Sequence, residues 1–208
     1  MAVFAENIRT MKKLIFASNN QYKAAEIKAI LVDAFSIQTM GEAGICIDIP
    51  EPFLTLEENA REKSSTIFRI TGLDCFSEDS GLEVEALNGA PGVHSARYAG
   101  LPSDSIANNN KLIEALNGIE NRRARFRTVI SLILNGKEFQ FEGICNGHIS
   151  ENYAGDAGFG YDPVFIPEGD SRTFAEMTMV EKSGISHRKK AMDEMTRFLT
   201  QKTDEGSL

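Results

Sequence analysis

The stretch of sequence that decides the fold is Arg125–Ile149, which reads RFRTVISLIL-NG-KEFQFEGICNGHI. Apolar and polar side chains alternate on each side of Asn135-Gly136, a dipeptide typical of a two-residue hairpin turn. The pattern therefore predicts two long antiparallel strands, Arg125–Leu134 and Lys137–Ile149. Because each strand has one apolar and one charged face, we expect at least part of the sheet to be antiparallel.

A strand followed by a helix is predicted near the N-terminus. Leu14–Ala17 has the pattern of a buried strand, Ser18-Asn19-Asn20 that of a turn and N-cap, and the helix should cover roughly Tyr22–Val32. This pair is the front half of a βα unit, so helices should flank the sheet. N–H groups of the helix N-terminus beside Lys23 would suit an anion, although an ordinary capped helix is the simpler interpretation of these residues alone.

Three further helices are predicted from their caps and apolar periodicity. Thr55 and Glu58 match a capping box, which should open a helix that runs to about Ile70. The amphipathic segment Ser103–Leu116 should form a second helix, ended by an Asn-Gly pair. Ser186 should cap the C-terminal helix. An irregular connection is expected over residues 41–54, because glycines and prolines punctuate it.

An acidic motif, Glu78-Asp79-Ser80-Gly81, follows a short apolar run. We expect it at a strand end where the backbone turns, with Leu82–Ala86 as a separate, half-exposed strand. Carboxylates in that setting hold a hard divalent cation, deprotonate a water or cap the next element. The four residues alone are equally consistent with a cap of the next element and with a catalytic site.

Composition narrows the class of protein. With 22 basic and 30 acidic residues, the net charge of −8 argues against a general nucleic-acid binder, but a small polyphosphate needs only a local cluster of cations. The three cysteines are far apart in the sequence and are interpreted as reduced thiols of a cytoplasmic protein. No apolar run is long enough to predict a membrane span.

The length of 208 residues suits one domain with a substantial core. Residues 1–10, which precede Met11, are interpreted as an N-terminal extension. A single two-lobed domain is expected over 11–201, with a C-terminal tail over 202–208.

Basic residues gather at the start of the predicted C-terminal helix, in His187–Lys190. Their charge opposes the helix dipole, which suggests that this end attracts an anion. Other polar segments add carboxylates for a metal, lysines for phosphates and an aromatic ring for stacking. The inventory fits a nucleoside triphosphate, and its members are Ser18–Lys23, Glu51, Lys63, Glu78–Gly81, Phe159–Asp162, Lys182 and His187-Arg188.

Five motifs in order resemble the inosine/xanthosine triphosphate pyrophosphatase family, over Leu14 to about Leu199. They are SNNQYK at 18–23, EDSGL at 78–82, GAPGVHSARY at 89–98, FGYDPVF at 159–165 and EKSGISHR at 181–188. Two residues depart from the family pattern: Asn19, where glycine is frequent, and Glu78, where a second aspartate is frequent. The first substitution could alter the loop backbone, because residues other than glycine resist positive φ.

The resemblance implies an α/β fold with a long, twisted, mixed sheet flanked by helices, and a nucleotide cleft between two lobes. It also implies a homodimer and Mg²⁺-assisted hydrolysis of ITP, dITP and XTP to the monophosphate and pyrophosphate. Asp79 would be metal ligand and water activator, Glu51 the second ligand, and Glu78 a supporting group.

The resemblance further implies a set of substrate-binding residues. Lys23, Lys63 and Lys182 would neutralise the triphosphate, Phe159 would stack on the purine, and donors such as His187 and Arg188 would select a base with an O6 acceptor. The full set is Ser18, Asn19, Asn20, Gln21, Tyr22, Lys23, Lys63, Ser80, Phe159, Gly160, Tyr161, Asp162, Lys182, His187 and Arg188.

Three alternatives remain at this point: a phosphatase that releases the γ-phosphate, a related pyrophosphatase acting on pyrimidine nucleotides, and a module that senses nucleotides without turnover. Asp79 and Lys23 together speak against the sensor, because binding alone needs no water-activating carboxylate. Arg97 could contact phosphate or a dimer partner. Arg122 and the three arginines that follow it are interpreted as an exposed strand face.

Overall fold

A computed structural model describes residues 13–30 and 36–204 of the chain. The predicted extension, Met11 and the end of the first predicted helix lie outside the described residues. The secondary structure comprises the strands β1 (Lys13–Phe16), β2 (Ser36–Thr39), β3 (Cys75–Val84), β4 (Pro91–Gly92), β5 (Arg123–Leu134), β6 (Lys137–Ile149) and β7 (Phe165–Pro167), and the helices α1 (Gln21–Ile30), α2 (Leu56–Thr71), α3 (Ser105–Ala115), α4 (Met179–Ile185) and α5 (His187–Asp204), with three short 3₁₀ turns.

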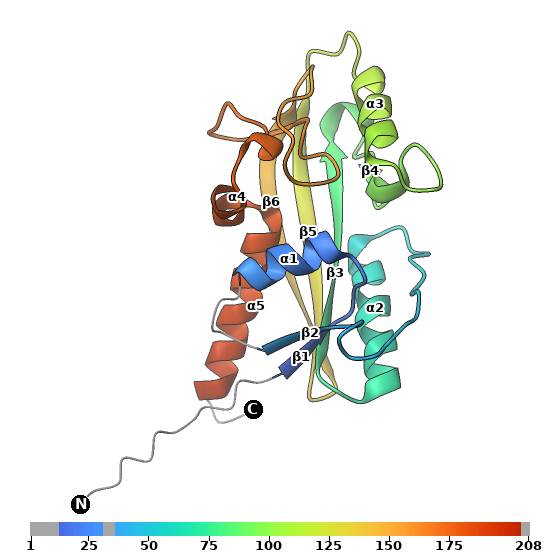
Figure 1. Ribbon diagram of the computed structural model, residues 1–208, viewed down its shortest axis with the longest axis vertical. Coiled ribbons are helices and arrows are strands. Elements are labelled where there is room, and N and C mark those ends of the chain that lie inside the picture. The colour runs from blue at the N-terminus through green and yellow to red at the C-terminus, as the bar shows by residue number, and fades with distance from the viewer. Residues whose placement is uncertain (1–12, 31–35, 205–208) are drawn as a thin grey trace, which may run out of the picture.

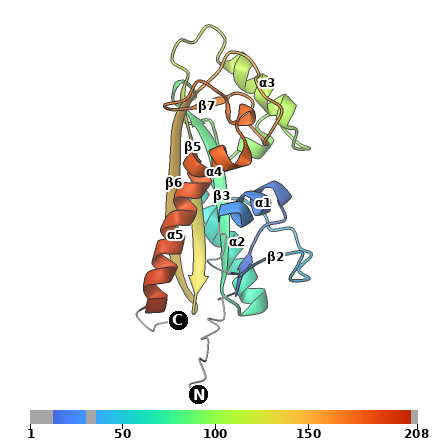
Figure 2. The ribbon, with the colours of Figure 1, turned by 60° about the vertical axis from the view of Figure 1, so that its left-hand side comes forward.

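The strands form one mixed sheet in the order β2-β1-β3-β5-β6-β7, with β4 paired to β3 (Figure 1). β1 pairs in parallel with β2 and β3, whereas the other pairs are antiparallel. Helix α2 covers one face, and α1 and α5 cover the other (Figures 1 and 2). This arrangement confirms the predicted α/β fold with a mixed sheet.

Two lobes share the long strands β3, β5 and β6 (Figure 1). We call the part with β1, β2, α1 and α2 the lower lobe, and the part with α3 and residues 150–178 the upper lobe. The lower lobe has a core on each face of the sheet, since Leu14 and Phe16 pack toward α5 whereas Ile15 packs toward α2. A separate aromatic core with Phe126 and Phe174 fills the upper lobe.

The β5–β6 hairpin is confirmed at its predicted position. Asn135 and Gly136 have φ values of 50° and 76°, as a type I′ turn requires, and Leu134 pairs with Lys137. The Thr55 cap of α2 is also confirmed, because its side chain accepts the N–H of Glu58.

The prediction for the acidic motif was wrong in one respect. Glu78-Asp79-Ser80-Gly81 lies inside the continuous strand β3 and pairs with β5, so there is no turn and no separate strand over 82–86. Since successive strand residues point to opposite faces, Glu78 faces α5 and Asp79 faces α2. The two carboxylates therefore have different environments.

Two other expectations also need correction. Arg122 is not on an exposed strand face: it precedes β5 and donates to the carbonyls of Leu116, Ile149 and Ser150. Helix α5 extends to Asp204 and so includes the first residues of the predicted tail. Among the described residues, no helix has the length and apolarity to cross a bilayer.

Buried ion pairs tie α1, α4, α5 and β3 together. The Arg188 guanidinium donates from Nε and Nη2 to Glu78 at 2.8 and 2.9 Å, and from Nη1 to Glu26. Lys182 Nζ donates to Glu26 and Asp162, each at 2.6 Å. We call this set, together with Lys23, the ion cluster; Lys23 Nζ lies 3.2 Å from Glu78 Oε1.

Close packing of α5 on β6 depends on Gly143. A Cβ at this residue would lie 2.0 Å from the carbonyl oxygen of His187 and 2.4 Å from the N atom of Ala191. We expect Gly143→Ala to lower the free energy of unfolding by about 3 kcal/mol, because a backbone would have to move. Gly41→Ala, which meets nothing within 4 Å, is the control; equal midpoints of urea unfolding for the two variants would contradict this account.

The ion cluster should make stability depend on pH. Burial alone would raise the pKa of Glu78, but Arg188 and Lys23 offset it and lower the pKa from 4.5 to about 2. Ionised Glu78 therefore stabilises the fold above about pH 4.5, and this contribution is lost as the pH falls toward 2. We expect Glu78→Gln, although less stable at pH 7, to lose less stability than the wild type between pH 5 and 2, by on the order of 3 kcal/mol.

A matched control for this titration is Glu42→Gln. Hydrogen bonds from Lys28 and Thr39 lower the pKa of Glu42 to about 2 as well, but this carboxylate is exposed and screened by solvent. Because solvent screens these contacts, the curve of its variant should lie closer to the wild-type curve than that of Glu78→Gln does, in urea unfolding measured across the pH range. Parallel stability curves for Glu78→Gln and the wild type would show that the buried ion pair does not govern the loss of stability at acid pH.

Candidate active site

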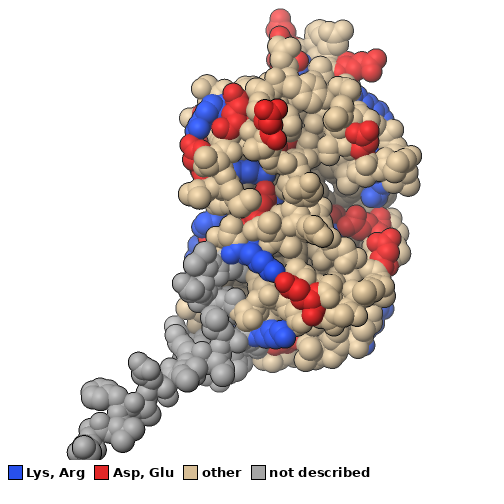
Figure 3. All heavy atoms as spheres, viewed as in Figure 1, with Lys and Arg blue, Asp and Glu red and all other residues tan. Residues whose placement is uncertain are grey.

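A cavity of about 420 Å³ lies between the two lobes, and the molecular surface is hollowed there (Figure 3). Its volume is in the range of small-molecule sites. Every residue predicted to bind substrate or metal lines it except Gln21, which opens α1, and the supporting Glu78 also lies outside the lining. The lining residues from the prediction are Ser18, Asn19, Asn20, Tyr22, Lys23, Glu51, Lys63, Asp79, Ser80, Phe159, Gly160, Tyr161, Asp162, Lys182, His187 and Arg188.

Glu51, Lys63 and Asp79 form what we call the carboxylate cluster. Lys63 Nζ donates to Glu51 Oε1 at 2.5 Å and to Asp79 Oδ1 at 3.2 Å. The three side chains come from the 41–54 connection, α2 and β3. Two carboxylates that contact one ammonium group are close enough to share a cation.

The two carboxyl groups differ in basicity. Burial raises the pKa of Asp79 above its ordinary value, and this effect outweighs the attraction of Lys63 and Lys23. Burial also acts to raise the pKa of Glu51, but Lys63, Lys23 and Arg97 offset it, so that this pKa is lowered. Asp79 is therefore the better proton acceptor of the two.

The segment that carries Glu51 is held at two points. Asn59 of α2 is fully buried, and its side-chain amide accepts from the N–H of Phe53 at 3.0 Å and donates to the carbonyl of the same residue at 3.1 Å. Arg97 donates to the carbonyl of Glu51 at 3.3 Å and lies 3.8 Å from its carboxylate. These contacts fix a carboxylate that an irregular segment would otherwise leave loosely placed.

The donor set around the carboxylate cluster suits a hard divalent cation. Mg²⁺ binds to one or two carboxylates and completes its octahedron with water and substrate phosphate oxygens. Within residues 13–30 and 36–204, no three His, Cys, Asp or Glu side chains form a site that could hold a metal ion. The carboxylate cluster offers two carboxylate ligands, those of Glu51 and Asp79.

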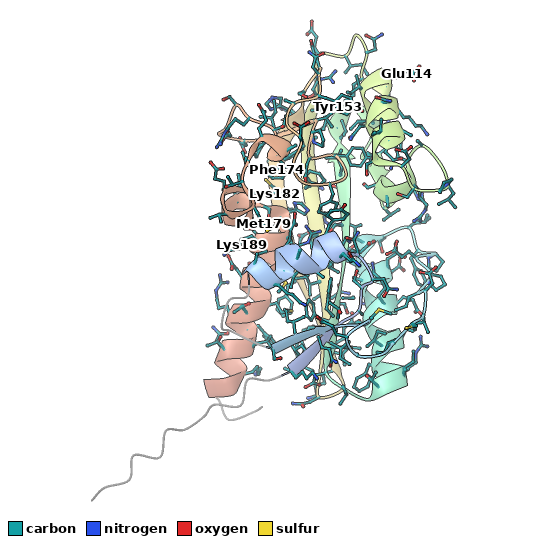
Figure 4. The ribbon with its side chains drawn as sticks, in the orientation of Figure 1. Glu114, Tyr153, Phe174, Met179, Lys182 and Lys189 are labelled. Atoms are coloured by element: carbon teal, nitrogen blue, oxygen red, sulfur yellow. The ribbon has the colours of Figure 1, made fainter. Side chains whose placement is uncertain are left out.

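Phe159 sits on a tightly held loop. Asp162 Oδ2 accepts the N–H of Phe159 at 2.8 Å, and a Cβ at Gly158 would lie 2.1 Å from that oxygen, so only glycine allows this closure. Asn109 of α3 donates to the carbonyl of Gly160 at 2.9 Å. Lys182 Nζ lies 5.0 Å from the centroid of the Phe159 ring. Figure 4 shows Lys182 beside Phe174, directed inward from α4.

His187 and Arg188 are both buried at the cavity wall. The His187 ring stacks on Phe126, with centroids 4.6 Å apart, and its Nδ1 has no hydrogen-bond partner among the described residues. Burial first, and then Arg188 and Lys182, hold the pKa of His187 well below its ordinary value. A neutral imidazole offers one donor and one acceptor, whereas the sequence suggested donors only.

The turn before α1 places Lys23 next to both clusters. Ser18 Oγ accepts the N–H of Asn20, and Asn20 Oδ1 accepts the N–H of Lys23, which confirms the predicted cap. Asn19 does not have a positive φ, so its difference from glycine costs no strain. Its side chain instead donates to the carbonyl of Ile47 at 3.0 Å and joins the turn to the 41–54 connection.

Sequence reasoning missed Glu26, Asn59 and Phe126. Glu26 binds both Lys182 and Arg188, and its position one turn after Lys23 on the same helix was the available signal. Asn59 and Phe126 looked like ordinary helix and strand positions, and no local pattern marks them.

Comparisons with known proteins identify the family. The Ham1 family model matches residues 14–198. A protein named dITP/XTP pyrophosphatase from Porphyromonas gingivalis is 51% identical over 191 residues, which cover 91% of this chain and 98% of that protein. The one from Flavobacterium johnsoniae is 47% identical over 188 residues, covering 90% and 98%.

A solved structure shows the same fold. The Ham1 protein of Staphylococcus aureus superposes with a TM-score of 0.83 at 38% identity, and the match covers 92% of this chain and all of that one. The resemblance drawn from the five motifs is thereby confirmed. Because the family model matches most of the chain, including both sides of the cavity, this chain belongs to the Ham1 family.

Proposed function

We propose that this chain hydrolyses deaminated purine nucleoside triphosphates (ITP, dITP and XTP) to the monophosphate and pyrophosphate. The observation that carries the proposal is a single cavity lined by both the carboxylate cluster and the Phe159 loop. The carboxylate cluster can bind a metal–polyphosphate, and the Phe159 loop can bind a flat nucleobase. The name dITP/XTP pyrophosphatase, given to the relatives, supports the substrate class.

Asp79 accepts a proton from the attacking water in this proposal. Burial raises the pKa of Asp79, which makes it a stronger base than an ordinary aspartate. Attack at the α-phosphorus then forms the nucleoside monophosphate, and pyrophosphate leaves. Lys63 and Lys23, which flank Asp79, neutralise the phosphate oxygens as charge shifts onto the leaving group.

Glu51 and Asp79 are the residues that would hold Mg²⁺. The ion would neutralise phosphate charge and make the attacking water more acidic. Lys63 now bridges these two carboxylates, so on binding of a metal–nucleotide its ammonium group can turn toward a phosphate. Lys182 also lines the cavity, where both of its hydrogen bonds go to buried carboxylates near Phe159.

Base selection would rest on hydrogen bonds at the cavity wall. Hypoxanthine and xanthine have an O6 acceptor where adenine has an amine, so a donor placed there rejects adenine by leaving one polar group unpaired. Neutral His187 can present an N–H in one tautomer. Arg188 uses three of its five N–H groups on Glu78 and Glu26, so two remain for the base. A homodimer and a cytoplasmic location also stay proposals.

Replacing the Asp79 carboxylate by an amide removes the proton acceptor but keeps the shape of the site. We expect Asp79→Asn to lower kcat for ITP by at least about 100-fold, the usual contribution of a positioned general base. Glu83→Gln is the control, because Glu83 is on the same strand but pairs with Arg125; its kcat should stay within about 2-fold of the wild type. A near-normal rate for Asp79→Asn, measured as pyrophosphate release, would remove Asp79 from catalysis.

Product analysis tests the reaction itself. With Mg²⁺, the protein should convert ITP and XTP to monophosphate and pyrophosphate, and GTP and ATP much more slowly. Chelation of the metal with EDTA should abolish turnover, and added Mg²⁺ should restore it. Orthophosphate as the product would favour attack at the γ-phosphorus, and binding without turnover would favour a sensing module.

A further inference from the structure

The aromatic ring of Tyr22 lies on the ring of Phe159. Their centroids are 5.4 Å apart and their planes differ by 19°, which is a stacked arrangement. Tyr22 is the second residue of α1 in the lower lobe, whereas Phe159 is on the upper-lobe loop. The contact therefore joins the two lobes across the cavity.

No base can lie between these two rings as they stand. Stacked aromatic rings are already in van der Waals contact at this centroid distance, so an inserted base would need the separation to grow by the thickness of a ring. A purine that stacks on this face of Phe159 must therefore displace Tyr22.

The other groups near the Phe159 ring cannot easily move away from it. Lys182 Nζ and Arg188 Cζ lie 5.0 and 5.8 Å from its centroid, and both are buried and paired with carboxylates of the ion cluster. Moving either cation would leave a buried charge uncompensated. Tyr22 is 64% exposed, so its ring can rotate into solvent.

We propose that Tyr22 competes with the substrate base for the stacking face of Phe159. In the free protein Tyr22 covers that face, and it must rotate away before a purine can stack. This inference rests on the proposed function, in which Phe159 is the platform for the base.

The competition has a distinctive thermodynamic signature. When only a fraction of the protein has an open site, the apparent dissociation constant of every ligand for that site rises by the same factor. Tyr22 would weaken the binding of ITP and GTP equally and leave their ratio unchanged. A tyrosine that touched the bound base would act in the opposite direction, because its removal would weaken binding.

The test compares Tyr22→Ala and Tyr22→Phe with the wild type, in steady-state pyrophosphate release from ITP and from GTP. For Tyr22→Ala, KM should fall by about 2- to 10-fold for both nucleotides, the range expected for one lost aromatic pair, with kcat within about 2-fold. Tyr22→Phe keeps the ring, so its KM should fall less than that of Tyr22→Ala. Alanine is a good helix former, so α1 is retained.

Tyr153→Ala is the control for the loss of an exposed tyrosine, since Tyr153 lies in the upper lobe far from α1 (Figure 4). Its KM should not change. An unchanged or raised KM for Tyr22→Ala, or a changed ITP-to-GTP ratio, would overturn the competition. In calorimetric titration with IMP, which involves no turnover, the dissociation constant should be lower for Tyr22→Ala than for the wild type. Absence of pyrophosphate release by the wild-type protein would instead refute the proposed function, a result separate from either Tyr22 outcome.

Discussion

The pairing of the buried Arg188 guanidinium with Glu78 and Glu26 is the interaction on which the rest of the site depends. A buried charge is tolerated only when it is matched and hydrogen-bonded, and here three cations face three carboxylates within the ion cluster. The residues come from α1, β3, α4, α5 and the Phe159 loop. Their positions are therefore coupled, because displacing one charge leaves another without its partner. The same pairing removes the apparent conflict with the α5 dipole, since His187 is neutral and Arg188 is balanced.

Much of the fold could be predicted because its signals are local. The Asn135-Gly136 turn, the Thr55 cap and the Asn20 cap each depend on residues within a few positions of one another. The continuous β3 strand could not be predicted in this way. Aspartate, glutamate and glycine are unfavourable in strands. Here buried cations from distant helices pair with the two carboxylates, and Gly81 leaves room for the backbone of β4.

The candidate site could likewise be predicted only in part. Residue types and their motifs predicted which side chains surround the cavity, but not what each of them contacts. Lys182 and Arg188 bind Glu26 across 156 and 162 residues of sequence, a distance that no spacing rule covers. Gln21 was included because its neighbours belong to a motif. Adjacent residues of a helix point about 100° apart, however, so a contiguous motif on α1 cannot face one cavity throughout.

The strands that both lobes share have a consequence for how the chain folds. Because β3, β5 and β6 run without interruption through the upper and lower lobes, no linker separates two independent cores (Figure 1). Neither half can complete its own sheet alone. Strands β3 and β5, which must pair, are some 50 residues apart in sequence. The molecule should therefore unfold in one cooperative step, and its assembly should be limited by closing long chain loops. Evolution can lengthen the loops at either end of such a molecule, but it cannot exchange one lobe for another.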